Sequence, residues 1–142
     1  VGQGFGPESM RELLQLPILA IDFAANGGTN FSKLELLRNE SMRNYYEDVV
    51  AIGHSAYEMV GFLNEAIEEL GAARKCNNVI ISGGIKNFLD GYYLTQKANI
   101  PAVYGQAAPF LKQANESQDA LDTFAESQIK GLLMAQKFLK VR

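Results

Sequence analysis

The chain is organised around one stretch, NVIISGGIKN, which runs from Asn78 to Asn87. Residues Val79 to Ser82 are apolar or small and favour a β-strand, and the paired glycines that follow remove every Cβ where the chain must turn. Main-chain N–H groups in such a turn point outward together, and with a helix N-terminus behind them they favour an anion such as a phosphate. A plain strand-to-helix connection fits these residues equally well, so the rest of the chain has to decide between the two.

Length and composition indicate a single domain with a real core, because 142 residues are 47% hydrophobic. Thirteen basic and 16 acidic residues give a formal net charge of -3. This balance offers no electrostatic reason to expect nucleic acid or an anionic membrane as a partner. No apolar run reaches membrane-spanning length and no signal peptide is visible. The single cysteine, Cys76, excludes an internal disulfide and fits a reducing compartment, so we expect a cytoplasmic protein.

Two more short apolar runs, residues 18–23 and 102–107, indicate further strands that are covered on both faces. Apolar residues at helical spacing predict helices between and around the strands. These helices begin at Ser9, at a cap formed by Thr29, Asn30 or Ser32, at Ser55, at Asp90 and near Asp119. The pattern weakens over residues 39–53, and residues 43–48 within it predict a solvated, mobile excursion with Tyr45 and Tyr46 as aromatic anchors.

Alternation of strands and helices implies a parallel sheet with right-handed crossovers. Two architectures are compatible with it, an open doubly wound sheet and a segment of a (β/α)8 barrel. A full barrel needs roughly 250 residues, so only about half of one would be present. In both, ligands bind at the carboxyl ends of the strands, where the Gly27-Gly28 and Gly83-Gly84 turns would lie together. The chain enters abruptly on a glycine-rich loop with no initiator Met, which indicates a cut.

Four stretches carry a resemblance to type 2 isopentenyl-diphosphate delta-isomerase, the flavin-dependent form of that enzyme. The sequence IDFAANGGTNF of residues 21–31, with Leu34-Glu35 and Arg38 behind it, resembles the family's sixth-strand motif. Residues 82–85 with Leu89-Asp90 resemble the seventh-strand motif, residues 107–111 are similar to the eighth-strand loop, and Val1-Gly2 to the end of the fifth strand. The resemblance covers nearly the whole chain, and the Gly-Gly-Thr-Asn-Phe stretch is its specific part.

What the resemblance implies is an FMN site. Thr29 matches a position that contacts FMN, and backbone positions on two later turns match those that bind the FMN phosphate. The implied cofactor-binding residues are Thr29, Gly83, Gly84, Ile85, Lys86, Ala107 and Ala108. The chain departs from the family at Ala24-Ala25, where Ser or Ala followed by Gly is usual, and at Lys86 and Ala108, which often correspond to Arg. Residues 53–56, GHSA, replace the family's Gly-Ile-Pro-Thr.

The acid–base groups of the family and the glutamate that holds Mg2+ against the substrate diphosphate have no counterpart here. We therefore expect no catalytic residue and no metal ligand in this chain. His54, the only histidine, is interpreted as a capping or surface residue, and Cys76 as an inert buried thiol. Asp22 either touches the ligand or pairs internally, with the internal partner favoured. Tyr92 and Tyr93 are expected to pack on a helix rather than to stack on a flavin.

The sequence therefore predicts an α/β chain that is the C-terminal half of a TIM (β/α)8 barrel, from the end of strand 5 through strand 8 and the C-terminal helix. Residues 1–142 would be one half-barrel segment of a longer chain. The intact enzyme is expected to interconvert isopentenyl and dimethylallyl diphosphate with FMN, Mg2+ and NADPH, whereas this half alone would be inactive. A homo-oligomer, or association with the missing barrel half, is expected. Two alternatives stay open: half of another FMN-dependent barrel, such as an α-hydroxy-acid oxidase, and a non-catalytic module that binds a phosphate ligand.

Overall fold

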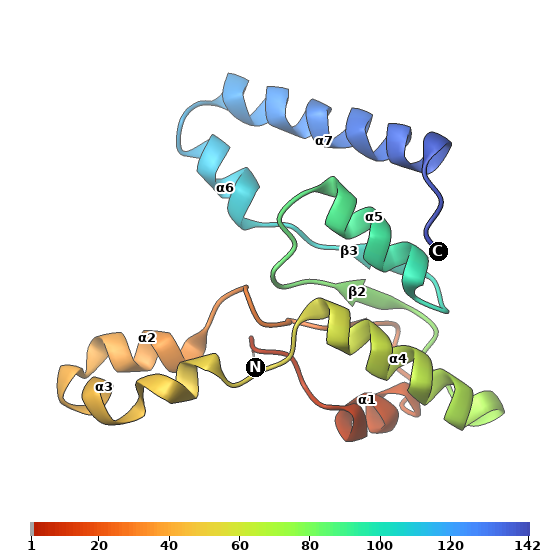
Figure 1. The fold of residues 1–142 in the computed structure, drawn as a ribbon, viewed down its shortest axis with the longest axis horizontal. Helices are drawn as coiled ribbons and strands as arrows, with labels where there is room; N and C mark the ends of the chain where they lie inside the picture. The colour runs from red at the N-terminus through yellow and green to blue at the C-terminus, as the bar shows by residue number, and fades with distance from the viewer. Residues whose placement is uncertain (1) are drawn as a thin grey trace.

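The structure is a computed structural model that describes residues 2–142. Val1, which the resemblance assigns with Gly2 to the end of a preceding strand, lies outside the described residues. The chain has the expected α/β architecture (Figure 1). Its elements are, in order, α1 (Pro7–Leu14), β1 (Ile21–Asp22), α2 (Phe31–Arg38), α3 (Glu40–Tyr46), the 3-10 turn η1 (Glu47–Ala51), α4 (Ala56–Leu70), η2 (Gly71–Ala73), β2 (Val79–Ile81), α5 (Phe88–Lys97), β3 (Ala102–Tyr104), α6 (Ala108–Ala114) and α7 (Gln118–Phe138).

The three strands form one parallel sheet in the order β1-β2-β3. Asp22 of β1 is aligned with Ile80 of β2, which is aligned with Val103 of β3. Hydrogen bonds continue past the strand ends, since Ala25 N–H donates to the Ser82 carbonyl at 2.9 Å. The carboxyl ends of all three strands therefore meet at one edge of the sheet, as the sequence predicts.

One face of the sheet carries the core. Ile21, Val79 and Ile81 are at most 4% exposed and pack with residues of α1, α4 and α5. The fully buried members of this core with the largest side chains are Phe23, Met10, Leu14, Met59, Leu63, Ile81 and Leu94. These helices also pack on one another: α1 on α4, α4 on α5, and α5 on α7 (Figure 1). The helices thus lie side by side over the sheet.

The opposite face of the sheet is open. Asp22 and Val103 are exposed, and even Ile80, on the central strand, is only half-buried. Parallel sheets are normally covered on both faces. The fold described by residues 2–142 is therefore an α/β layer with a small parallel sheet, compatible with half of a barrel.

Helix termini are set by local chemistry. The Ser55 side chain accepts from Glu58 N–H, and the Glu58 carboxylate accepts from Ser55 N–H at 2.8 Å, so α4 begins with a capping box. Asn30 caps α2 by accepting from Lys33 N–H. Asn87 caps α5, which therefore starts two residues before the predicted Asp90.

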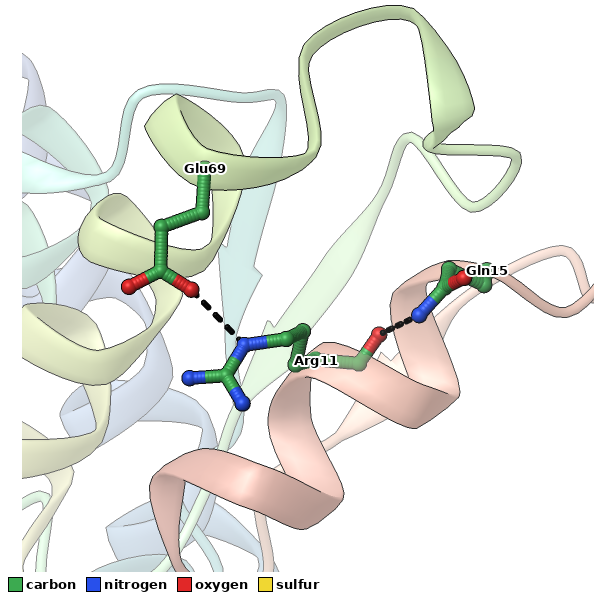
Figure 2. A network of polar contacts seen from close by, with 3 residues as sticks. All are labelled: Arg11, Gln15 and Glu69. Carbon is green, nitrogen blue, oxygen red and sulfur yellow. Dashed lines mark hydrogen bonds and ion pairs between the residues drawn. The ribbon is translucent and has the colours of Figure 1, made fainter.

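An exposed ion pair joins helices α1 and α4. Figure 2 shows Arg11 of α1 donating from Nε to Oε2 of Glu69 on α4 at 2.7 Å. Gln15 donates to the Arg11 carbonyl at 3.2 Å. Because the Arg11 and Glu69 side chains are 42% and 56% exposed, the pair contributes at most about 1 kcal/mol to stability. The apolar contacts between α1 and α4 hold the two helices together.

Residues 43–48 are exposed, as predicted, and they are helical, as part of α3 and η1. The predicted anchors are wrong, because Tyr45 and Tyr46 are 83% and 49% exposed. Instead the Asn30 side chain donates to the Val50 carbonyl at 2.8 Å. Helix α6 was not predicted, since no helix was expected between residues 107 and 119. Pro109 occupies its first turn, where the missing N–H costs nothing.

The predicted strand over residues 18–23 is shorter in the structure. Leu19 is 85% exposed and Ile18 is 38% exposed, so apolar character alone overestimated the buried strand. The predicted helices around Met10, from Ser55 and near Asp119 are confirmed as α1, α4 and α7. No helix within residues 2–142 is long and apolar enough to cross a membrane.

Candidate functional site

The carboxyl ends of the three strands enclose a cavity of about 820 Å³. Each strand contributes the turn that follows it, and the amino-terminal segment adds Gly2. The lining residues are Gly2, Ala24, Ala25, Gly27, Gly28, Thr29, Phe31, Ser82, Gly83, Gly84, Ile85, Gly105, Gln106, Ala107, Ala108 and Leu111. This volume lies within the range of small-molecule and cofactor sites.

Glycine is required where the first two turns touch. Gly27, Gly83 and Gly84 have φ values of 103°, 87° and 74°. A Cβ on Gly83 would lie 2.0 Å from the Ala25 carbonyl oxygen, and one on Gly27 would lie 2.7 Å from the Gly84 Cα. The two turns therefore pack backbone against backbone. These glycines are needed for that packing whether or not a ligand is bound, so they do not by themselves identify the ligand.

A polar cluster fixes the turn after β1. The Asp22 carboxylate accepts from Ala24 N–H at 3.0 Å and from the Ser82 hydroxyl. Ala24 N–H also lies 3.1 Å from Ser82 Oγ. The internal partner favoured for Asp22 is thus confirmed, and it joins the turn after β1 to the turn after β2.

The structure brings six of the seven predicted cofactor-binding residues to the cavity. Thr29, Gly83, Gly84, Ile85, Ala107 and Ala108 all line it. Lys86 does not line it: its main-chain N–H donates to Asp90 Oδ2 at 3.0 Å instead. The geometry therefore gives Lys86 no part in the cavity.

The first turn of α5 is also engaged within the chain. Asn87 Oδ1 accepts from the N–H groups of Leu89 and Asp90, at 2.9 and 3.0 Å. A ligand in the cavity would consequently meet the backbone of residues 83–85 rather than the N-terminus of α5. The turn before α6 differs, since Ala107 makes no side-chain capping hydrogen bond.

Gln106 is a cavity residue that the sequence reasoning missed. The atoms Nε2 and Oε1 of its amide are buried and have no hydrogen-bond partner within residues 2–142. A buried amide without partners is costly, and this one belongs to a residue that lines the cavity. The sequence offered no signal for it, because Gln106 lies within the predicted strand over residues 102–107.

The other candidates have structural roles. His54 is half-buried and packs edge-to-face on Phe62, with 5.0 Å between the ring centroids. The predicted capping or surface role is therefore wrong, since Ser55 caps α4. Cys76 is fully buried, as predicted. Tyr92 is buried and donates to the Leu139 carbonyl at 2.9 Å, and Tyr93 lies against Tyr57, so both pack as predicted.

No ionised side chain lines the cavity, although the Asp22 carboxylate accepts hydrogen bonds from two lining residues, Ala24 and Ser82. None of the residues that line it carries a carboxylate or an ammonium group. On β3, burial raises the pKa of the Tyr104 phenol further above its ordinary value. Within residues 2–142, no group of three or more His, Cys, Asp or Glu side chains is arranged to hold a metal ion.

These features define a class, an α/β protein with a small-molecule cavity at the carboxyl ends of parallel strands. No family model matches the chain. Curated proteins named isopentenyl-diphosphate delta-isomerase are similar to it. The one from Ignicoccus hospitalis is 32% identical over 130 residues, that from Methanococcus maripaludis 29% over 135, and that from Rickettsia bellii 26% over 121.

The similarity extends over most of this chain but over a minor part of each relative. The matches cover 90%, 93% and 84% of this chain and 34%, 35% and 33% of the respective relatives. The chain therefore spans about a third of the length of the curated relatives that it matches.

Proposed function

We propose that this chain is the phosphate-binding part of an FMN-dependent isopentenyl-diphosphate delta-isomerase, folded as the carboxyl-terminal half of a (β/α)8 barrel. The observation that carries the proposal is the convergence of three small-residue turns on one cavity at the carboxyl ends of adjacent parallel strands. The isomerase names of the relatives supply the reaction class.

The cavity suits a phosphate group. Its lining lacks carboxylates, and its turns expose backbone where Cβ atoms are missing or small. Backbone N–H groups around Gly84 and Ala108 would hold the phosphate oxygens, while the Gln106 amide offers one further donor. Thr29, at the opposite rim, would contact the remainder of the flavin. The residues present therefore fit the group.

The one-sided packing of helices supports a barrel half. In a doubly wound sheet, helices cover both faces, whereas here the core helices lie on the Ile21 and Ile81 face. In a barrel the opposite face points inward and is filled by side chains from the other strands. Asp22, Ile80 and Val103 would then be interior residues.

In the intact enzyme, the substrate would be an isopentenyl or dimethylallyl diphosphate, with Mg2+ neutralising the diphosphate and NADPH serving as reductant. FMN, when bound, would supply a reduced ring that takes part in proton transfer. The residues of this chain would hold its phosphate, orient it and exclude water. In this proposal the acid–base groups belong to the remainder of the enzyme. A cytoplasmic location is part of the same proposal.

The experiment that tests the site compares FMN with riboflavin, which lacks the phosphate, in fluorescence titrations of the purified chain. We expect FMN to bind at least about tenfold more tightly, since only it fills the backbone cradle. Ala108→Asp should remove this preference, because a carboxylate beside the phosphate repels it. Ala108→Asn, of equal size and uncharged, is the control. Equal binding of the two flavins, or an Ala108→Asp change without effect on FMN, would contradict the site.

Catalysis is tested separately. The chain alone, supplied with FMN, NADPH and Mg2+, is expected to give no isomerisation of isopentenyl diphosphate, because a phosphate cradle binds without transferring protons. Product analysis by mass spectrometry or NMR checks this. Turnover by the isolated chain would show that the acid–base groups lie within it.

A further inference from the structure

Residues 2–6 form a fixed segment beside the turn that follows β1. Gly4 N–H donates to the Ala24 carbonyl at 2.8 Å. The ring of Phe5 packs edge-to-face on that of Phe23, which is fully buried. Gly2, at the start of the segment, lines the cavity at the strand ends. The segment is therefore held by the core on one side and reaches the cavity on the other.

The side chain of Gln3 ties both ends of a projecting lobe to this segment. The lobe, residues 31–51, comprises α2, α3 and η1 (Figure 1). Gln3 Nε2 donates to the Val50 carbonyl at 3.1 Å and to the Ile52 carbonyl. Gln3 Oε1 accepts from the Ser32 hydroxyl at 3.1 Å. One amide thus uses its donor group at the end of the lobe and its acceptor at the beginning.

The backbone next to Gln3 lies against the rim of the cavity. Gln3 does not line the cavity, but Gly2, Thr29 and Phe31 all do. A Cβ on Gly2 would lie 2.3 Å from the Thr29 carbonyl oxygen and 3.1 Å from the Phe31 ring. Because Phe31 is the first residue of α2, the lobe begins in the cavity wall. A change in the position of the rim therefore reaches Gln3 through direct contact.

Few other contacts join the two ends of the lobe. No described side chain within residues 31–51 is fully buried. The ion pairs of Arg38 with Glu35 and of Arg43 with Glu47 lie within the lobe itself. Among the described residues, the other side-chain hydrogen bond between its ends runs from Asn30 Nδ2 to the Val50 carbonyl, at 2.8 Å. Loss of the Gln3 bridge should therefore be felt strongly by the lobe.

We propose that Gln3 is a positioning residue, which couples occupancy of the cavity to docking of the lobe 31–51 on the segment 2–6. A molecule in the cavity fixes Gly2, Thr29 and Phe31, and Gln3 then holds the two ends of the lobe against them. Coupling between two sites is reciprocal, so loss of the Gln3 bridge also weakens binding in the cavity. The inference rests on the proposed function only for the choice of a flavin as the occupant.

The test measures flavin binding by fluorescence and amide exchange by mass spectrometry. In the parent chain, saturating FMN is expected to slow exchange over residues 31–51 by about fivefold or more. In Gln3→Leu this slowing should vanish at saturating FMN. Affinities for FMN and riboflavin should fall by the same factor, about fivefold or more, because Gln3 acts on the rim and not on the phosphate. Ser32→Ala, which removes one of the hydrogen bonds, should give a smaller effect in the same direction.

Two controls separate this role from a general loss of stability. Gln15→Leu makes the same substitution at a residue whose side chain donates to the Arg11 carbonyl on α1, away from the lobe and the cavity. Ile100→Val trims a core side chain that is 8% exposed and does not line the cavity, so it lowers stability without touching the bridge. Both variants should keep the parent's flavin affinities and the slowing of exchange by FMN.

The result can be told apart from that of the flavin-site experiment. Equal affinities for FMN and riboflavin, with exchange over 31–51 still slowed by either flavin, contradict the phosphate site and support the coupling. Flavin binding without slowing over 31–51, or slowing that persists in Gln3→Leu, overturns the coupling.

If neither flavin binds, the flavin site fails and the ligand-free chain decides the role of Gln3. His54 N–H donates to the Gln3 carbonyl at 2.7 Å, and Asn26 N–H donates to the His54 carbonyl at 2.8 Å. Gln3→Leu should speed exchange at both amides by about tenfold, because the segment loses its hold on the neighbouring loop. Faster exchange there supports the positioning role, and unchanged rates overturn it.

Discussion

Ala24, in the turn after β1, is the one non-glycine residue within 2–142 with a positive φ, at 42°. The left-handed region costs an L-residue about 1–2 kcal/mol, and glycine avoids this cost. The greater backbone freedom of glycine in the unfolded chain offsets about half of that gain. Ala24→Gly is therefore expected to raise the free energy of unfolding by about 0.5–1 kcal/mol. Urea denaturation measures this change.

The matched control is the next residue. Ala25 is fully buried and has no positive φ, so Ala25→Gly loses a packed methyl group and should lower the free energy of unfolding by about 1 kcal/mol. If both substitutions changed stability in the same direction, strain at Ala24 would not be the cause.

Glu58 gives α4 a dependence on pH. A hydrogen bond from the Ser55 hydroxyl, and to a smaller extent one from Ser55 N–H, holds the pKa of the Glu58 carboxyl below its ordinary value. A carboxyl group whose pKa is lower in the folded than in the unfolded state stabilises the folded protein when the pH is above its ordinary pKa. This contribution is lost as the pH falls through the folded-state pKa. Chemical denaturation should therefore show Glu58→Gln less stable than the parent near neutrality, with the difference vanishing in acid.

A control for that comparison is Glu65→Gln, which removes one negative charge from an exposed position further along the same helix. Its effect should be smaller near neutrality. A stability difference for Glu58→Gln that persists unchanged at low pH would mean that the capping carboxylate is not responsible.

Single residues explain which parts of the site were predictable. The glycine turn at Gly83 and Gly84 was predictable because a glycine pair directly after an apolar run is typical of a tight turn, and close backbone contact with Ala25 and Asn26 requires glycine at both positions. Lys86 stays a prediction, and the sequence could not show that its main-chain N–H donates to Asp90 or that it does not line the cavity. Gln106 was missed because an unpaired buried amide can be recognised only in three dimensions.

Helix packing on the sheet and between helices depends on glycines within helices. A Cβ on Gly131 of α7 would lie 2.5 Å from the ring of Phe88 on α5, so α7 sits close to α5 only because the residue is glycine. Gly131→Ala is expected to lower the free energy of unfolding by about 1–2 kcal/mol, since overpacking outweighs the gain in helix propensity. Thermal unfolding measures the loss.

Gly61 of α4 provides the contrast, because a Cβ there would meet nothing within 4 Å. Gly61→Ala should raise the free energy of unfolding by about 0.5–1 kcal/mol through helix propensity and reduced freedom of the unfolded chain. Equal effects at Gly61 and Gly131 would show that the contact between α5 and α7 tolerates a methyl group.

At the scale of elements, the sequence predicted helices best where one apolar face is buried. Met59, Leu63 and Ala66 on α4 are nearly inaccessible, and the stripe was visible in the sequence. The helices α3 and η1 bury no described side chain. They therefore need no apolar stripe, which is the feature that identifies a helix in the sequence. Their hydrogen bonds with the loop at Asn30 form only once the chain has folded.

Across the whole molecule, stability should be unevenly distributed. Residues 31–51, which project from the sheet as α2, α3 and η1 (Figure 1), include no fully buried described side chain, whereas α4 contributes five buried residues to the core. Local opening costs little where few apolar contacts are lost. Native-state hydrogen exchange should therefore show near-intrinsic rates over 31–51 and the slowest rates in α4. Similar protection in both regions would contradict this distribution.

The parallel sheet and the position of its glycine turns followed from the sequence because strands and helices alternate and each strand ends in small residues. The open face was not predictable in the same way. Ile80 has the same apolar character as Ile81, and only the structure shows that Ile81 is buried while Ile80 is half-buried. Which face of a strand is covered is decided by elements that are distant in the chain.

The burial of Cys76 makes the core open to chemical observation. Its thiol is the only one in the chain and is fully buried where α1 meets the segment leading into β2, since Cys76 N–H donates to the Leu14 carbonyl. A thiol-specific reagent added to the native protein should react only as fast as this region opens. The modification rate would then report the separation of α1 from the sheet directly, without an introduced label.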